Sequence, residues 1–282
     1  MTRIGEILIN ALINSLSLLI RKPYLFLASL VFSLISMVAF FLNIETITYF
    51  FLNIAYGIIP NISPKTVLFD TILMYYNEII ILVLVLLFIL LMNFLAYAVY
   101  SAFVKEITEG KKDKASFTKA FSDGLSKALP LLGFVFIVFF LCLFLASVCL
   151  FFMWLVGNNF LATLIILLLL GILSVYLALK LLFVVPALFD VESKASRNRI
   201  KSKNSVLAQA IAKSWNFSSK NMSVIFVLLL ILAFVTSFLS SLVGVFVYPI
   251  LDINVKLGVT TILTSIISTY SYLVLPYYYF KK

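Results

Sequence analysis

Side chains that usually carry catalytic chemistry are scarce in this sequence. Histidine is absent, which removes imidazole acid–base catalysis and imidazole metal ligands. Cys142 and Cys149 stand seven residues apart in one apolar run. That is about 10 Å along a helix, too far for a disulfide within it. The sequence contains neither a glycine-rich phosphate loop nor a cluster of metal-ligand side chains. We therefore expect no catalytic residue, no cofactor and no metal, and we predict that the protein is not an enzyme.

One lysine stands inside an apolar stretch that is otherwise free of charge. Lys180 lies nine residues before Phe189, and ionisable residues within a membrane usually mark function. Its long stem can instead carry the ammonium group toward the membrane surface. The sequence leaves both interpretations open.

Small hydroxyl side chains gather in the last two apolar stretches, many of them four residues apart. This spacing lets helices approach closely, and the hydroxyls can bond across the contact or to their own helix. A polar cavity between the two stretches is the alternative interpretation. The residues that form the candidate polar site inside the membrane, together with Lys180, are Ser237, Ser241, Thr264 and Ser268.

Two charged loops are rich in lysine and arginine. Basic side chains near a membrane attract anionic lipid headgroups, at roughly 1 kcal/mol per residue. The alternative is that the charges only orient the chain, and the lack of interleaved aromatic residues argues against nucleic acid as a partner. The candidate contacts with anionic headgroups are Lys111, Lys112, Lys114, Arg197, Arg199, Lys201 and Lys203.

The elements that must position these residues are predicted to be membrane-spanning helices. Hydrophobic residues make up 64% of the 282-residue chain and charged residues only 11%, whereas a soluble domain is roughly half apolar and a quarter charged. A water-soluble globular protein is therefore excluded. A helix of ~20 apolar residues crosses a bilayer. Six stretches qualify, at Tyr24–Ile44, Ile79–Val104, Leu129–Val156, Leu161–Phe189, Met222–Val247 and Leu257–Phe280.

The charge distribution predicts how these helices are oriented. Eighteen of the 21 lysine and arginine residues fall on one side of a six-span topology, in segments 1–23, 105–128 and 190–221 and at the C-terminal end. Because basic segments stay in the cytoplasm, both termini of this cell-membrane protein are predicted to be cytoplasmic. The apolar stretch Ile47–Ile59 is too short to cross. We expect it to extend the first span outward or to lie at the opposite interface.

A short motif recurs before the first, third and fifth predicted spans. Each copy has an alanine, a large apolar residue, two variable residues, a small residue and a large apolar residue, beginning at Ala11, Ala120 and Ala210. Each is predicted to form an amphipathic helix at the cytoplasmic interface, followed by a two-span hairpin. We thus predict one all-α membrane domain of three hairpins, with pseudo-repeats 1–104, 105–189 and 190–282. Chance recurrence in so apolar a sequence is the alternative.

The junction between the second and third hairpins resembles a known membrane domain. It reads Leu181-Leu-Phe-Val-Val-Pro186-Ala-Leu-Phe-Asp-Val-Glu192, and then Ala208-Gln-Ala-Ile-Ala-Lys-Ser214-Trp215-Asn216. This pattern is similar to the six-span membrane domain attached to some glycerophosphodiester phosphodiesterases and to its uncharacterised prokaryotic relatives. The resemblance implies a six-span membrane protein of unassigned activity. The spans leave no room for the phosphodiesterase domain itself, so no catalytic residue carries over.

Three functions are compared on these observations. A non-enzymatic membrane scaffold or organising module is favoured, because titratable residues are scarce in the spans. A transporter, or a path for lipid along a polar face of the fifth and sixth spans, is the alternative. An enzyme that modifies lipids at the inner surface is the third, and it would need Glu106, Asp190 and Glu192 to converge in one cleft. The expected partners are the lipid bilayer and anionic headgroups, and the sequence identifies no protein partner.

Overall fold

The computed structural model describes residues 2–53, 76–110, 116–157, 159–198, 205–249 and 253–281. Within these residues the chain forms helices joined by turns, with no strand. Six helical segments are long and apolar enough to cross a membrane, so the prediction of a multi-pass, all-α membrane protein is confirmed. The segments are Pro23–Leu42, Tyr76–Thr108, Ala128–Met153, Leu161–Val191, Val206–Val247 and Val255–Lys281.

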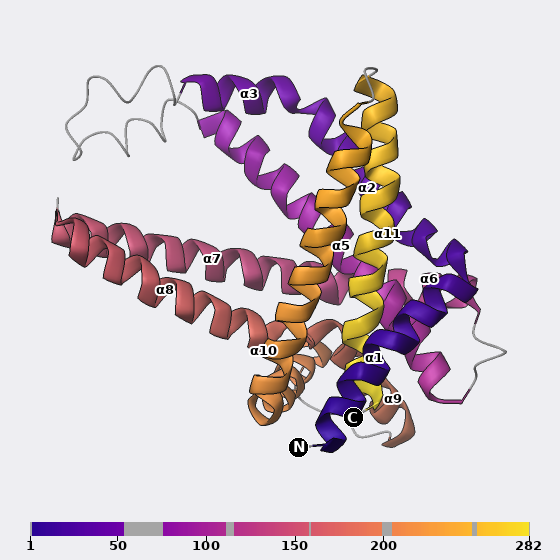
Figure 1. The fold of residues 1–282 in the computed structure, drawn as a ribbon. Coiled ribbons are helices and arrows are strands. Elements are labelled where there is room, and N and C mark those ends of the chain that lie inside the picture. The colour runs from indigo at the N-terminus through magenta and orange to yellow at the C-terminus, as the bar shows by residue number, and fades with distance from the viewer. Residues whose placement is uncertain are drawn as a thin grey trace.

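The long helices pair along the chain and diverge from one end of the molecule (Figure 1). α7 and α8 lie side by side and extend away from α10 and α11, which pack on each other. α1 packs against α11, and both chain ends lie where α9 is found. The elements are α1 (Thr2–Arg21), the 3-10 helix η1 (Pro23–Leu25), α2 (Phe26–Leu42), α3 (Ile44–Asn53), α5 (Tyr76–Thr108), α6 (Phe117–Leu125), α7 (Ala128–Val156), α8 (Phe160–Leu181), α9 (Val184–Asn198), α10 (Val206–Val247) and α11 (Ile253–Lys281).

The buried core lies toward one end of the helices and not along their whole length. Continuous runs of buried residues cover Leu95–Val104 of α5, Phe183–Phe189 at the start of α9 and Leu273–Tyr279 of α11. By contrast, between 0% and 22% of the most apolar window of each spanning segment is buried inside the protein. The apolar surface that remains is far larger than a soluble protein exposes, and in a membrane it faces lipid.

A break at Leu182 and Phe183 separates α8 from α9, and Pro186 stands in the first turn of α9. Pro186 has no N–H to donate to the carbonyl of Leu182, and its ring crowds that carbonyl, so the helix ladder is interrupted there. The Ala187 amide donates to the Phe183 carbonyl at 2.9 Å and restarts the ladder. The spanning segment Leu161–Val191 thus contains one break near its end.

A kink lies between the third amphipathic stretch and the fifth span. The sequence predicts an amphipathic helix at Ala210 and a span from Met222, and α10 covers both as two helical parts that meet at Asn221, where φ is −130° and ψ is 16°. The Asn221 side-chain amide donates to the Phe217 carbonyl at 2.8 Å. A side chain that competes for the helix ladder in this way favours a kink at its position.

The short apolar stretch after the first span forms a helix of its own. α2 ends at Leu42, and α3 begins at Ile44 and packs against α5. The prediction for Ile47–Ile59 concerned both this helix and residues 54–59, and the latter lie outside the described residues.

A buried hydrogen-bond cluster joins α2, α5 and α11. The Tyr100 hydroxyl donates to the Leu25 carbonyl at 2.7 Å and accepts from the Ser29 amide at 3.0 Å. The Ser29 hydroxyl lies 2.6 Å from the Thr269 hydroxyl and donates to the Ser265 carbonyl at 2.8 Å. Because buried polar groups need partners, this cluster sets the register of the two helices, α5 and α11, that carry the site described next.

The recurring motif places its alanine and its small residue in helix contacts. α6 packs on α5, the first part of α10 on α8 and α9, and α1 on α11. A Cβ added to Gly124 would lie 2.9 Å from the Val99 backbone of α5, and the Ser214 hydroxyl donates to the Lys180 carbonyl at 2.7 Å. The buried pairs are Ala11 with Ser15, Ala120 with Gly124, and Ala210 with Ser214.

Candidate functional site

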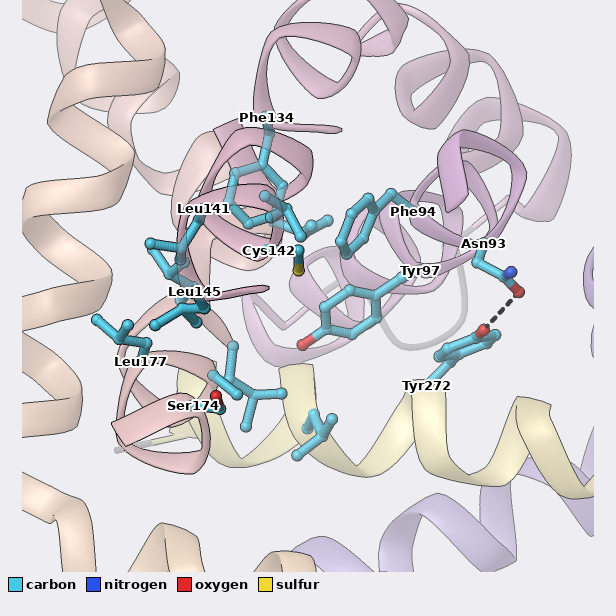
Figure 2. Close-up of a pocket in the computed structure, with 16 residues that line it drawn as sticks. Asn93, Phe94, Tyr97, Phe134, Leu141, Cys142, Leu145, Ser174, Leu177 and Tyr272 are labelled. Carbon is cyan, nitrogen blue, oxygen red and sulfur yellow. Dashed lines mark hydrogen bonds between the residues drawn. The ribbon is translucent and has the colours of Figure 1, made fainter. Parts of the chain in front are cut away.

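A cavity of about 390 Å³ lies among α5, α7, α8 and α11. Its walls are almost wholly apolar, and Figure 2 shows Phe94, Phe134 and Leu141 closing one side of it. Leu145 and Leu177 line it from the paired helices α7 and α8. Small-molecule sites usually have volumes of roughly 300–1,000 Å³ and apolar walls with few polar groups. The cavity has the size and lining of a ligand site.

One polar group in the cavity wall has no partner. Tyr97 is 6% exposed, and its hydroxyl oxygen is buried without a hydrogen bond to any residue that the structure describes. Figure 2 shows this hydroxyl directed among the lining side chains, toward the side of the cavity that carries Leu145 and Ser174. A buried hydroxyl left unpaired costs about 1–3 kcal/mol. Tyr97 therefore offers a donor to a ligand in the cavity.

A second tyrosine separates this cavity from a polar one. The Tyr272 hydroxyl donates to the Asn93 side-chain oxygen at 3.2 Å (Figure 2). The Tyr272 ring lies 5.8 Å from that of Tyr97 and 5.9 Å from that of Tyr100, centroid to centroid. Tyr272 also lines a cavity of about 300 Å³ between α10 and α11. One aromatic ring thus forms part of the wall of both cavities.

The polar cavity contains half of the hydroxyls that the sequence predicts for it. Thr264 and Ser268 line it, as the sequence predicts, but Ser237 and Ser241 do not and are exposed on another face of α10. The Thr264 hydroxyl donates to the Thr260 carbonyl of its own helix at 2.7 Å, so its oxygen can still accept a hydrogen bond from a ligand. The other lining residues are Thr236, Ser240, Ile267, Ser271 and Tyr272, of which only Ile267 lies outside the cluster of polar residues in the last two apolar stretches.

Lys180 lies outside both cavities, in a contact between α8 and α10. Lys180 is 3% exposed, and its ammonium group donates to the Ser219 hydroxyl. The ammonium also lies 5.0 Å from the Tyr176 ring centroid and 5.2 Å from that of Trp215, within reach of cation–π attraction. The side chain is buried and does not extend to solvent, and the structure does not bring it together with the predicted hydroxyls.

Two described carboxylates of the charged segments, Glu106 and Asp190, form ion pairs between helices. Lys119 of α6 donates to Glu106 of α5 at 2.7 Å, and Lys213 of α10 donates to Asp190 of α9. The hydrogen bond that Lys119 donates to the Glu106 carboxylate raises the pKa of Lys119 above its ordinary value. Among the described residues no group of histidine, cysteine and carboxylate side chains is arranged to hold a metal ion.

The basic residues predicted to contact anionic headgroups fall mostly outside the described part of the chain. Lys111, Lys112 and Lys114, and likewise Arg199, Lys201 and Lys203, lie outside the described residues. Arg197 is in α9, but its side chain is not described, and the same holds for Glu192.

The chain was compared with protein-family models, with curated proteins and with solved structures, and no match was found in any of the three.

Proposed function

We propose that this multi-pass membrane protein is a non-enzymatic lipid-binding protein. The cavity among α5, α7, α8 and α11 holds a hydrocarbon chain, and the polar part of the same molecule lies beyond Tyr272, toward Thr264 and Ser268. The observation that carries the proposal is the buried Tyr97 hydroxyl, which lines an apolar cavity and has no partner among the described residues.

The polar contacts make the proposed site selective among lipids. A hydrocarbon chain that moves from the bilayer into the cavity gains little, because lipid tails are as apolar as leucine side chains. A hydrogen bond in a water-free site is stronger than one in water. The Tyr97 hydroxyl therefore favours lipids with an ester carbonyl, ether or hydroxyl oxygen near the top of a chain. Of the functions predicted from the sequence, this is closest to the lipid path along the fifth and sixth spans.

A scaffold or organising role is the second candidate function. The specific observation in its favour is the fourth spanning segment, Leu161–Val191, whose most apolar window has no buried residue. Together with α7 it forms an apolar arm that is open to lipid or to another membrane protein (Figure 1).

The proposed membrane arrangement has three hairpins, each preceded by an amphipathic helix at the cytoplasmic interface, with both chain ends in the cytoplasm of a cell-membrane protein. Its support is the shared packing of α1, α6 and the first part of α10, each of which lies against the end of an even-numbered span. The contact of α1 with α11 extends this packing to the first and the last of the three predicted repeats. A relationship to the membrane domain found with some glycerophosphodiester phosphodiesterases is part of the proposal and rests on the sequence of residues 181–192 and 208–216 alone.

Filling the apolar cavity tests the lipid-binding proposal. Leu177→Trp places a large ring in the cavity, whereas Leu167→Trp makes the same change on a part of α8 that is 47% exposed and lines neither cavity. Native mass spectrometry of the purified proteins reports co-purifying lipid. We expect wild type and Leu167→Trp to retain a lipid and Leu177→Trp to lose it. A wild-type protein without lipid, or equal retention by both variants, would overturn the proposal.

A further inference from the structure

Two further cavities adjoin each other where α1 meets the ends of α5 and α11. Their volumes are about 310 Å³ and 230 Å³, and Asn14 and Tyr277 line both of them. Arg21 and Lys22 line the larger cavity, and Lys281 lines the smaller one. No residue is shared with the apolar cavity or with the polar cavity described above.

The polar side chains that line these two cavities are donors or cations, and none is acidic. Elsewhere in the described part of the chain, lysines such as Lys119 and Lys213 have a carboxylate partner. Arg21, Lys22 and Lys281 have no ion pair with any described carboxylate. Three positive charges around a shared space repel one another, and an anion that enters it relieves the repulsion.

The position of the cavities indicates which anion is within reach. Lys22 directly precedes the first spanning segment, Pro23–Leu42, and Lys281 ends the last one, Val255–Lys281. The cavities therefore lie at the level where the chain leaves the hydrocarbon region, which is where the phosphates of membrane lipids are found. Tyr277, which is 7% exposed, belongs to a residue type that is enriched at this level.

We propose that these cavities form a binding site for the phosphate group of an anionic phospholipid. The Arg21 guanidinium pairs with two phosphate oxygens in the planar geometry that suits phosphate, and the two lysines add charge. The Asn14 side chain has two N–H groups, of which one is bonded to the Asn10 carbonyl at 2.7 Å, and the other is available to the phosphate. Ser17 adds a hydroxyl from the next turn of α1.

The test measures binding of phosphatidylglycerol to the purified full-length protein in detergent by native mass spectrometry. The variant Arg21→Gln/Lys281→Gln removes two charges from the cavities. Lys220→Gln/Lys256→Gln removes two charges from positions that line none of these cavities and is the matched control. We expect the first variant to bind phosphatidylglycerol about thirty-fold more weakly and the control to change by less than about twofold. An equal loss of phosphatidylglycerol binding in the two variants would show only a general attraction of the lipid to positive charge and would contradict the proposed site.

Two further measurements keep the proposal testable if the double variant folds poorly. Asn14→Asp places a carboxylate between the cations and supplies the missing counter-ion, so it should reduce phosphatidylglycerol binding to a similar extent without removing a charged residue. Inorganic phosphate is then added to the wild-type complex. The lipid should remain bound, and displacement by equimolar free phosphate would show that the phosphate alone is the ligand and would contradict the assignment to a lipid.

Discussion

Two tyrosines one helical turn apart on α5 have opposite surroundings. The Tyr100 hydroxyl is bonded to Leu25, Ser29 and Thr269, whereas the Tyr97 hydroxyl has no partner among the described residues. Both side chains are buried, at 0% and 6% exposure respectively. The contrast separates a tyrosine that holds helices together from one that is available to a ligand.

Removing each hydroxyl should therefore have opposite results. Tyr100→Phe leaves its buried partners with fewer hydrogen bonds, and we expect it to lower the free energy of unfolding by about 1–3 kcal/mol. Tyr97→Phe removes a hydroxyl that is unpaired in the lipid-free protein, so we expect its Tm to equal or slightly exceed that of wild type. Thermal unfolding in detergent measures both. The interpretation is wrong if delipidated Tyr97→Phe loses as much stability as Tyr100→Phe, or if added lipid raises the Tm of Tyr97→Phe as much as that of wild type.

At this scale the sequence predicts the polar cavity in part. Thr264 and Ser268 were found because they recur at a spacing of four residues in an apolar helix. The same spacing relates Ser237 to Ser241 and Thr236 to Ser240, and only the second pair lines the cavity. The two rows are neighbours on one helix, and the rotation of α10 about its axis decides between them. Packing against α11 sets that rotation, and no local pattern in the sequence records it.

At the scale of the helices, each amphipathic helix packs closely on a spanning helix at a small residue. Gly124 of α6 faces Val99 of α5, and a Cβ added to Gly124 would lie 2.7 Å from the Val99 side chain and 2.9 Å from its backbone. Backbone atoms cannot move aside as a flexible side chain can. The small residue of the recurring motif is thus a condition for α6 to pack on α5.

Gly124→Ala should therefore displace α6. We expect a loss of about 1–3 kcal/mol from overpacking, which outweighs the gain of roughly 0.5–1 kcal/mol that alanine brings to a helix interior. Gly171→Ala in α8 is the matched control, because nothing lies within 4 Å of the added Cβ, and it should keep or raise the Tm. Hydrogen exchange of residues 117–125 locates the effect. Unchanged exchange in Gly124→Ala would contradict close packing at this contact.

Helix ends show which features of an element the sequence determines. The spans are predictable because a bilayer demands ~20 apolar residues, and the break between α8 and α9 follows from Pro186. The Ala210 motif and the fifth span meet at a kink at Asn221, one residue before the predicted start of the span at Met222. No proline or glycine stands between Ala210 and Met222, so the loss of apolar character, and not a helix-breaking residue, marks this boundary in the sequence.

For the whole molecule, packing is concentrated at one end, and the spans diverge from it (Figure 1). The buried runs of α5, α9 and α11 lie near the ends of the even-numbered spans, where α6, the first part of α10 and α1 pack on them. Composition alone predicts that lipid surrounds this protein. The way in which the helix pairs diverge from one end depends on contacts between distant segments, which composition does not give.

The same end of the molecule should face the cytoplasm. Most of the chain's 21 basic residues fall in segments at this end, and moving them across the bilayer is costly. In a background of Cys142→Ala and Cys149→Ala, we expect a membrane-impermeant maleimide to label Tyr248→Cys in intact cells and Ser126→Cys only after permeabilisation. Tyr248 is 80% exposed at the far end of α10, and Ser126 is exposed in the turn between α6 and α7, so both thiols are reachable once the reagent has access. Labelling of Ser126→Cys in intact cells would reverse the orientation and would place the cationic cavities beside Asn14 at the outer surface.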